Sequence, residues 1–241
     1  MQASGNEREQ MLTLLTATGA RPEAWTFCER WMLAQDYHGP VRWLVVDDGA
    51  QPQPIGFSRD GWKLELIRPT PAWDLGQNTQ ARNLLAGLAV IAPEDRVVII
   101  EDDDWYASDW LSYVAKELET ADLVGECRAR YYNLAHRRAR QMSNNSHASL
   151  CSTAIKGAAI TSFREACERQ PKFIDLELWR RSKEKRVFGG HRVVGMKGLP
   201  GRHGIGIGHL RQFSGCYDAD GSLLREWIGG DADEYWKLRF P

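Results

Sequence analysis

The stretch Val97–Asp104, with the sequence VVIIEDDD, decides the expected fold of this chain of 241 residues. Its first four residues are apolar and β-branched, which is typical of a strand buried on both faces, the kind found in parallel sheets. Four acids follow directly. In an open α/β sheet, ligands bind just beyond the carboxyl ends of the strands, and clustered carboxylates there suit a hard divalent cation that bridges to phosphate. The stretch therefore predicts a metal and phosphate site at the end of a central strand.

An acidic loop that leads into a helix near Ser108 and Asp109 is the alternative explanation of these acids, because acids favour helix N-termini. One or two acids would fit that explanation. Four in succession repel one another and need a counter-ion, which favours the metal site.

Strands and helices alternate around this stretch. Strands are expected at 11–16, 41–46, 63–67 and 97–100, and helices at 22–35, 78–91 and 110–118. This alternation predicts an α/β fold with a doubly wound, mostly parallel sheet flanked by helices. Further along the chain the alternation weakens. We expect a strand pair within 122–132, a loop over 137–145, a strand and a helix within 152–167, and a helix at 175–185. The glycine-rich segment over 188–208 is expected to be flexible or tightly turned.

The charge of the chain is unevenly distributed, although its net value is only −1. Residues 1–124 carry 10 Lys/Arg against 20 Asp/Glu, whereas residues 125–212 carry 18 against 6, a net charge of +12. The basic part indicates either a polyanionic partner or phosphate groups near that surface, or simply mutual neutralisation of the two halves.

The chain has 43% hydrophobic and 26% charged residues, which is typical of a globular protein. It holds no apolar run long enough for a transmembrane helix, and its N-terminus is polar, so a cytoplasmic protein is expected. Its five cysteines are scattered without a C-x-x-C pair, so neither a disulfide framework nor a zinc site is expected.

Four short motifs stand in a fixed order along the first half of the chain. They are TATGARPE at 16–23, LVVDDG at 44–49, ARN at 81–83 with Leu88, and EDDDW at 101–105 with DWL at 109–111. Together they resemble the motifs of the GT-A fold glycosyltransferases, most closely those of family 2. The resemblance covers about residues 11–210. It implies a GT-A domain over 1–212, with a nucleotide-sugar half at 11–124 and an acceptor half at 125–212, followed by a C-terminal extension over 213–241.

The resemblance also implies roles for residues of the first half. Asp103 would be a direct ligand of Mn²⁺ or Mg²⁺, which neutralises the diphosphate leaving group as a Lewis acid, and Asp102 would contact the sugar or ribose. Asp104 completes an alternative D-x-D register with Asp102, because Glu101 stands where the family usually has Asp. Asp48 would hydrogen-bond the nucleobase of a donor, with a UDP-sugar favoured. The same pocket would be lined by Thr16, Thr18, Arg21 and Arg82.

In the second half, the segment 174–180 resembles the second acidic motif of the family. An inverting transfer needs a general base to take the proton of the acceptor hydroxyl. Asp175 falls on the base position and Glu177 is the second choice; an acid at a helix N-terminus is the structural alternative. The resemblance further implies a late histidine as an additional metal ligand, which would be His209 or else His203.

The acceptor is left open by the sequence. The stretch 128–140 interleaves cations with aromatic residues, a composition that can follow a phosphate backbone and stack on bases. A hydroxymethylated base in DNA is therefore one candidate acceptor, and a saccharide or a lipid-linked acceptor is another. A nucleotidyltransferase and a non-catalytic nucleic-acid-binding protein are the competing classes of function.

Overall fold

The computed structural model describes residues 10–169, 172–202, 204 and 213–238. Its strands are β1 (Leu12–Thr18), β2 (Val41–Asp47), β3 (Trp62–Ile67), β4 (Val97–Ile99), β5 (Trp105–Tyr106), β6 (Leu123–Glu126), β7 (Arg130–Asn133), β8 (Arg138–Gln141), β9 (Thr153–Ile155), β10 (Lys185–Phe188), β11 (Val193–Lys197) and β12 (Cys216–Tyr217). Its α-helices are α1 (Pro22–Leu33), α2 (Gln80–Leu88), α3 (Trp110–Glu117), α4 (Ala158–Arg169), α5 (Ile174–Arg181), α6 (Ser222–Ile228) and α7 (Ala232–Trp236).

The larger sheet has the strand order β10-β6-β9-β4-β1-β2-β3. β1 pairs in parallel with both β2 and β4, and β2 pairs in parallel with β3. These strands alternate between two apolar cores, as the period of two in a strand requires. In β2, Trp43 and Val45 belong to one core, whereas Leu44 and Val46 belong to the other. The four strands expected from the first hundred residues are thus confirmed.

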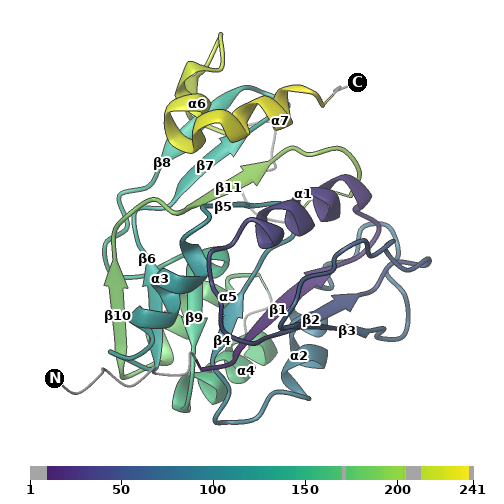
Figure 1. Ribbon diagram of the computed structural model, residues 1–241, viewed down its shortest axis with the longest axis vertical. Helices are drawn as coiled ribbons and strands as arrows, with labels where there is room; N and C mark the ends of the chain where they lie inside the picture. The colour runs from purple at the N-terminus through teal and green to yellow at the C-terminus, as the bar shows by residue number, and fades with distance from the viewer. Residues whose placement is uncertain (1–9, 170–171, 203, 205–212, 239–241) are drawn as a thin grey trace, which may run out of the picture.

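Each face of the larger sheet is covered by a different set of elements. Helices α2, α4 and α5 bury their apolar residues in one core. Helices α1 and α3, the smaller sheet and the C-terminal helices build the other core. Figure 1 shows the smaller sheet together with α6 and α7 at one end of the molecule, with α1 between them and the larger sheet.

The smaller sheet, with the strand order β12-β8-β7-β11-β5, was not expected from the sequence. The expected strand pair within 122–132 is wrong as a pair, because β6 and β7 belong to different sheets. The expected loop over 137–145 contains β8, in which Ala139 is buried between exposed arginines. β11 likewise lies inside the glycine-rich segment, and all five of its residues are buried. The expectation of one mostly parallel sheet is also too simple, because β9 runs antiparallel to both β4 and β6.

The C-terminal residues pack closely against the N-terminal half. The ring of Tyr235 stacks on that of Phe27 at 4.4 Å, and its hydroxyl accepts a 2.9 Å hydrogen bond from the Trp31 indole. Asp218 accepts hydrogen bonds from the hydroxyl of Tyr132 and from the first turn of α6.

Among the described helices, we find none with the length and apolar composition that crossing a membrane requires.

Candidate active site

The carboxyl ends of β1, β2 and β4 meet at one edge of the larger sheet. In the parallel register Thr18 of β1 lies opposite Asp47 of β2, and Leu15 lies opposite Ile99 of β4. The loops that follow these strands therefore bring Arg21, Asp48 and the acidic run 101–104 together. This is the edge at which open α/β sheets bind ligands.

Arg21 holds two acids of the run in place. Its guanidinium donates to Asp102 Oδ1 at 2.5 Å and to Asp103 Oδ2 at 2.7 Å, and the Thr18 hydroxyl donates to Asp102 Oδ2 at 2.7 Å. Burial raises the pKa of Asp102 to about 6, although Arg21 opposes that shift. The structure thus brings together three residues that the sequence assigned to the donor pocket.

Lys197, at the end of β11, pairs with the other acids of the run. Its Nζ lies 3.0 Å from Asp104 Oδ1 and 3.9 Å from Asp103 Oδ2. The backbone amide of Met196 donates to the same oxygen of Asp104 at 2.8 Å. Asp104 is fully buried, so this carboxylate anchors the end of β11.

The metal-ligand roles of Asp103 and Asp104 stay predictions, and two observations bear on them. Asp103 and Asp104 share the ammonium of Lys197 between them, and a divalent cation there would be repelled by it. Among the described residues, one group with ligand atoms within 4.8 Å of one another consists of Glu101, Asp104 and Cys151. That group includes a thiol, whereas hard cations of this kind prefer oxygen ligands. His203 and His209 lie outside the described residues, and their roles stay predictions.

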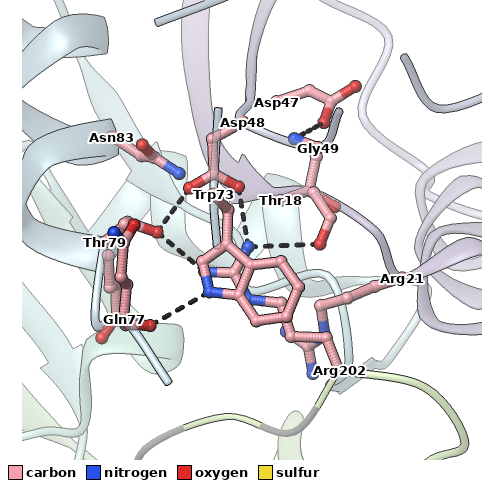
Figure 2. A network of polar contacts seen from close by, with 12 residues as sticks. Thr18, Arg21, Asp47, Asp48, Gly49, Trp73, Gln77, Thr79, Asn83 and Arg202 are labelled. Atoms are coloured by element: carbon pink, nitrogen blue, oxygen red, sulfur yellow. Dashed lines mark hydrogen bonds and ion pairs between the residues drawn. The ribbon is translucent and has the colours of Figure 1, made fainter. Parts of the chain in front are cut away.

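Asp48 is the centre of a second polar network, shown in Figure 2. Arg202 donates to Asp48 Oδ1 at 2.7 Å and to the Thr79 hydroxyl at 2.7 Å. Thr79 itself donates to Asp48 Oδ2, to which Arg82 also donates at 3.1 Å. The guanidinium of Arg202 lies over the ring of Trp73, 4.3 Å from its centroid.

The charge of Asp48 follows from these contacts. Burial alone would raise the pKa of Asp48, but the hydrogen bonds from Thr79, Asn83 and Arg202 outweigh burial and lower it. The carboxylate is therefore ionised at neutral pH. Its two oxygens provide about four acceptor sites, and the donors of Thr79, Arg82, Asn83 and Arg202 fill them.

Two further expected pocket residues, Thr16 and Arg82, contact the residues around this network. Thr16 is fully buried two residues before the end of β1, where its hydroxyl accepts a 3.0 Å hydrogen bond from the Trp43 indole. Arg82 donates to the carbonyl of Pro71 at 2.8 Å as well as to Asp48. Neither is among the described residues that line the adjoining cavity, and neither are Asp48 and Trp73. The donor-site roles of Thr16 and Arg82 stay predictions.

A cavity of about 400 Å³ joins the acidic run to the second half of the chain. Its donor-side lining includes Thr18, Arg21, Asp102 and Asp103, beside Lys197 and Arg202. Its opposite lining includes Tyr131, Arg140, Met142, Phe173, Asp175 and Phe213. The cavity therefore holds carboxylates and cations on one side, and an acid among aromatic, apolar and basic side chains on the other.

Asp175 and Glu177 have different surroundings although they stand two residues apart in α5. Asp175 lines the cavity, and burial raises its pKa. Its charge also raises the pKa of Glu101, so the two acids lie close enough to interact. Glu177 instead accepts hydrogen bonds from Arg180 and Arg181 at 2.8–3.2 Å, and it is not among the described lining residues.

The sequence did not indicate Lys197, Arg202 or Trp73. The two cations stand in the glycine-rich segment and are 93 and 154 residues away from their acidic partners. Trp73 follows β3 in an irregular segment, with its indole N–H bound to the carbonyl of Gln77. The only sign in the sequence of a site role for Lys197 and Arg202 is their position beside glycine-rich turns, which is weak evidence.

Several arginines of the basic stretch 128–140 are exposed, and they also contact the C-terminal segment. Arg130 and Arg137 lie over the rings of Trp227 and Trp236, at 4.9 and 5.5 Å. Arg138 and Arg140 donate to the carbonyl of Gly215 and the hydroxyl of Ser214. These arginines are partners of the C-terminal segment, and a DNA partner stays a prediction.

Two mixed sheets flanked by helices, with a cavity at the carboxyl ends of the parallel strands, give an α/β fold that is similar to the GT-A fold. A solved structure with this fold is that of S. aureus TarS, with a TM-score of 0.56 and 11% sequence identity over 78% of this chain and 37% of that one. TarS 1–349 in complex with UDP gives a TM-score of 0.56 at 10% identity, covering 78% of this chain and 60% of that one. TarS 1–349 with UDP-GlcNAc gives 0.51 at 10% identity, covering 80% and 60%.

The chain thus spans less than two thirds of these TarS chains. At such low sequence identity, the structural likeness shows the fold alone. No protein-family model matches the sequence, and no curated protein matches it.

Proposed function

We propose that this protein is a glycosyltransferase that moves a sugar from a nucleotide-sugar, with a UDP-sugar favoured, to an acceptor hydroxyl. One observation carries the proposal: a single cavity is lined by the acidic run with Arg21 on one side and by Asp175 on the other. A donor diphosphate and a general base need this arrangement. The TarS structures that share the fold hold UDP and UDP-GlcNAc, which favours the same class of donor here.

In this proposal the donor lies along the carboxyl ends of β1, β2 and β4. Asp48 accepts a hydrogen bond from the nucleobase, and Asp102, fixed by Thr18 and Arg21, accepts one from the ribose or the sugar. The diphosphate then lies beside Arg21, whose guanidinium also bridges Asp102 and Asp103. Arg202 leaves Asp48 when the base arrives, since the acceptor sites of that carboxylate are otherwise filled.

The transfer itself is a single displacement with inversion. The carboxylate of Asp175 takes the proton of the acceptor hydroxyl while the hydroxyl oxygen forms its bond to the anomeric carbon. The bond from that carbon to the β-phosphate oxygen breaks, and the nucleoside diphosphate leaves with the electron pair. Burial raises the pKa of Asp175, which makes it a stronger base than an exposed aspartate.

The acceptor hydroxyl enters, in this proposal, from the side lined by Tyr131, Met142 and Phe173. Aromatic faces of this kind suit a sugar ring. A saccharide or a lipid-linked acceptor is consistent with that lining.

Water can replace the acceptor, so release of UDP from UDP-GlcNAc and from UDP-glucose tests the proposal without a known acceptor. We expect slow hydrolysis by the wild type and a loss of about 10²–10⁴-fold in Asp175→Asn, the usual contribution of a general base. Glu168→Gln, which changes an exposed carboxylate on the neighbouring helix, should hydrolyse like the wild type. Full activity in Asp175→Asn would refute the base, and a loss in Glu177→Gln alone would transfer that role to Glu177. Absence of both hydrolysis and UDP binding in the wild type would refute the donor site.

A further inference from the structure

We infer that Lys197 binds the donor diphosphate as a built-in cation, together with Arg21, at the place where the acidic run predicts a divalent metal. The inference rests on the proposed function and concerns how the same site neutralises its substrate. It starts from the position of one buried ammonium group that the sequence did not indicate.

The surroundings of Lys197 fix where its charge lies. The side chain is only 8% exposed, and its Nζ lies 3.0 Å from Asp104 and 3.9 Å from Asp103. The ring of Tyr131 has its centroid 5.8 Å from the same atom. A lysine is buried in this way only when it is paired, so the two carboxylates are what keeps the ammonium at the cavity.

Asp104 acts as the support of Lys197 in this arrangement. Its Oδ1 accepts from both the amide of Met196 and the ammonium of Lys197. These two contacts fix the end of β11 against the acidic run. Among the described residues Lys197 lines the cavity and Asp104 does not, so the cation, and not the carboxylate, is presented to a ligand.

Two cations lie along the acidic run. Arg21 bridges Asp102 and Asp103, and Lys197 bridges Asp103 and Asp104. Both cations line the same cavity. An ammonium has three donors, and the contact with Asp104 uses one of them, which leaves donors for phosphate oxygens. As the glycosidic bond breaks, negative charge grows on the diphosphate, and a fixed cation in a poorly solvated site stabilises that charge.

The alternative is that a divalent ion does this work and that Lys197 only supports the fold. The two explanations differ in how UDP binding depends on metal. They also differ in whether Lys197 distinguishes UDP from uridine, which has the same base and ribose but lacks phosphate.

The experiment measures the affinities of UDP and uridine by isothermal titration calorimetry, in EDTA and in Mn²⁺. The variants are Lys197→Met, Lys197→Arg and the control Lys63→Met, in which an exposed lysine on β3 is replaced. For the wild type we expect UDP affinities within about threefold of each other in EDTA and Mn²⁺. We expect Lys197→Met to weaken UDP about 30-fold, equivalent to about 2 kcal/mol, to leave uridine unchanged, and to be partly rescued in Lys197→Arg.

Loss of wild-type UDP binding in EDTA would overturn the inference without needing any variant to fold. So would a Lys197→Met protein that binds UDP as the wild type does, or one that weakens uridine and UDP equally. If the wild type binds neither uridine nor UDP under either condition, it is the proposed function that fails. Thermal unfolding of each variant, compared with Lys63→Met, identifies a variant that is not folded.

Discussion

Arg202→Ala should make the protein bind uridine and UDP more tightly. In the structure Arg202 fills the place at which a nucleobase would meet Asp48. Its flat guanidinium lies 4.3 Å from the centroid of Trp73 and donates to Asp48 at 2.7 Å, so it makes the stacking and hydrogen bonding that a base would make. A nucleobase and Arg202 therefore compete for the same contacts.

The size of the effect follows from the contacts that hold Arg202 in place. A hydrogen bond to a charged group contributes about 1.5–3 kcal/mol, and a cation over an aromatic ring contributes about 0.5–1 kcal/mol at an exposed site. Ordering the long side chain of Arg202 costs up to about 2 kcal/mol of conformational entropy, which offsets part of this stabilisation. With the full offset, the net preference for the closed arrangement is up to about 2 kcal/mol, at which the site is open in about 3% of molecules. Removal of Arg202 should therefore tighten nucleoside binding severalfold, by up to about 30-fold.

Uridine titrations followed by NMR test this effect, because uridine does not report on the phosphate contacts. Arg59→Ala is a matched control, since Arg59 lies over Trp62 at 5.0 Å and donates to backbone carbonyls elsewhere. We expect this control to bind uridine like the wild type. Unchanged or weaker uridine binding in Arg202→Ala would refute the reasoning and would make Arg202 a part of the binding surface.

Four further predictions concern pH and stability. Donor hydrolysis should fall as the pH drops through the raised pKa of Asp175, so the acid limb of its pH profile should lie above the ordinary aspartate range and should vanish with Asp175→Asn. Arg21→Met leaves two buried carboxylates without their bridge and should destabilise the fold by about 3–5 kcal/mol in urea unfolding. Tyr235→Phe removes the partner of the Trp31 indole and should lower stability by about 1–3 kcal/mol in the same assay; an unchanged midpoint would contradict this. Burial raises the pKa of Glu126 to about 7 from 4.5, so between these pH values the folded state binds a proton that the unfolded state does not. The free energy of unfolding should therefore fall as the pH rises from 4.5 to about 7, by up to about 3 kcal/mol. Unfolding measured from pH 5 to 8 should show this slope in the wild type and not in Glu126→Gln.

The donor side of the site could be predicted because its residues follow strands that pair in parallel. The end of each strand is marked in the sequence by polar residues after an apolar run, and parallel strands end at the same edge. Thr18, Asp48 and Asp102 could therefore be placed together before any contact was known. Thr16 was placed with them because it belongs to the same motif, but it lies deeper in the strand, where Trp43 covers it.

The second half was harder to predict because its contacts are not local. β8 was not predicted because three of the four residues at 137–140 are arginines, which is typical of a loop. The burial of Ala139 between two exposed arginines follows only from its packing beneath the C-terminal segment. The glycines around β11 concealed a strand whose burial is set by the smaller sheet. No period in the sequence could indicate that Lys197 meets Asp104, because that contact depends on how the two sheets are joined.

A crystal structure of the protein with bound UDP tests the central claim most directly. The account predicts uracil stacked on Trp73 and bound to Asp48, with Arg202 displaced and the diphosphate beside Arg21 and Lys197. UDP bound elsewhere, or a crystal soaked in UDP in which Arg202 still holds Asp48 and the cavity contains no nucleotide, would contradict it.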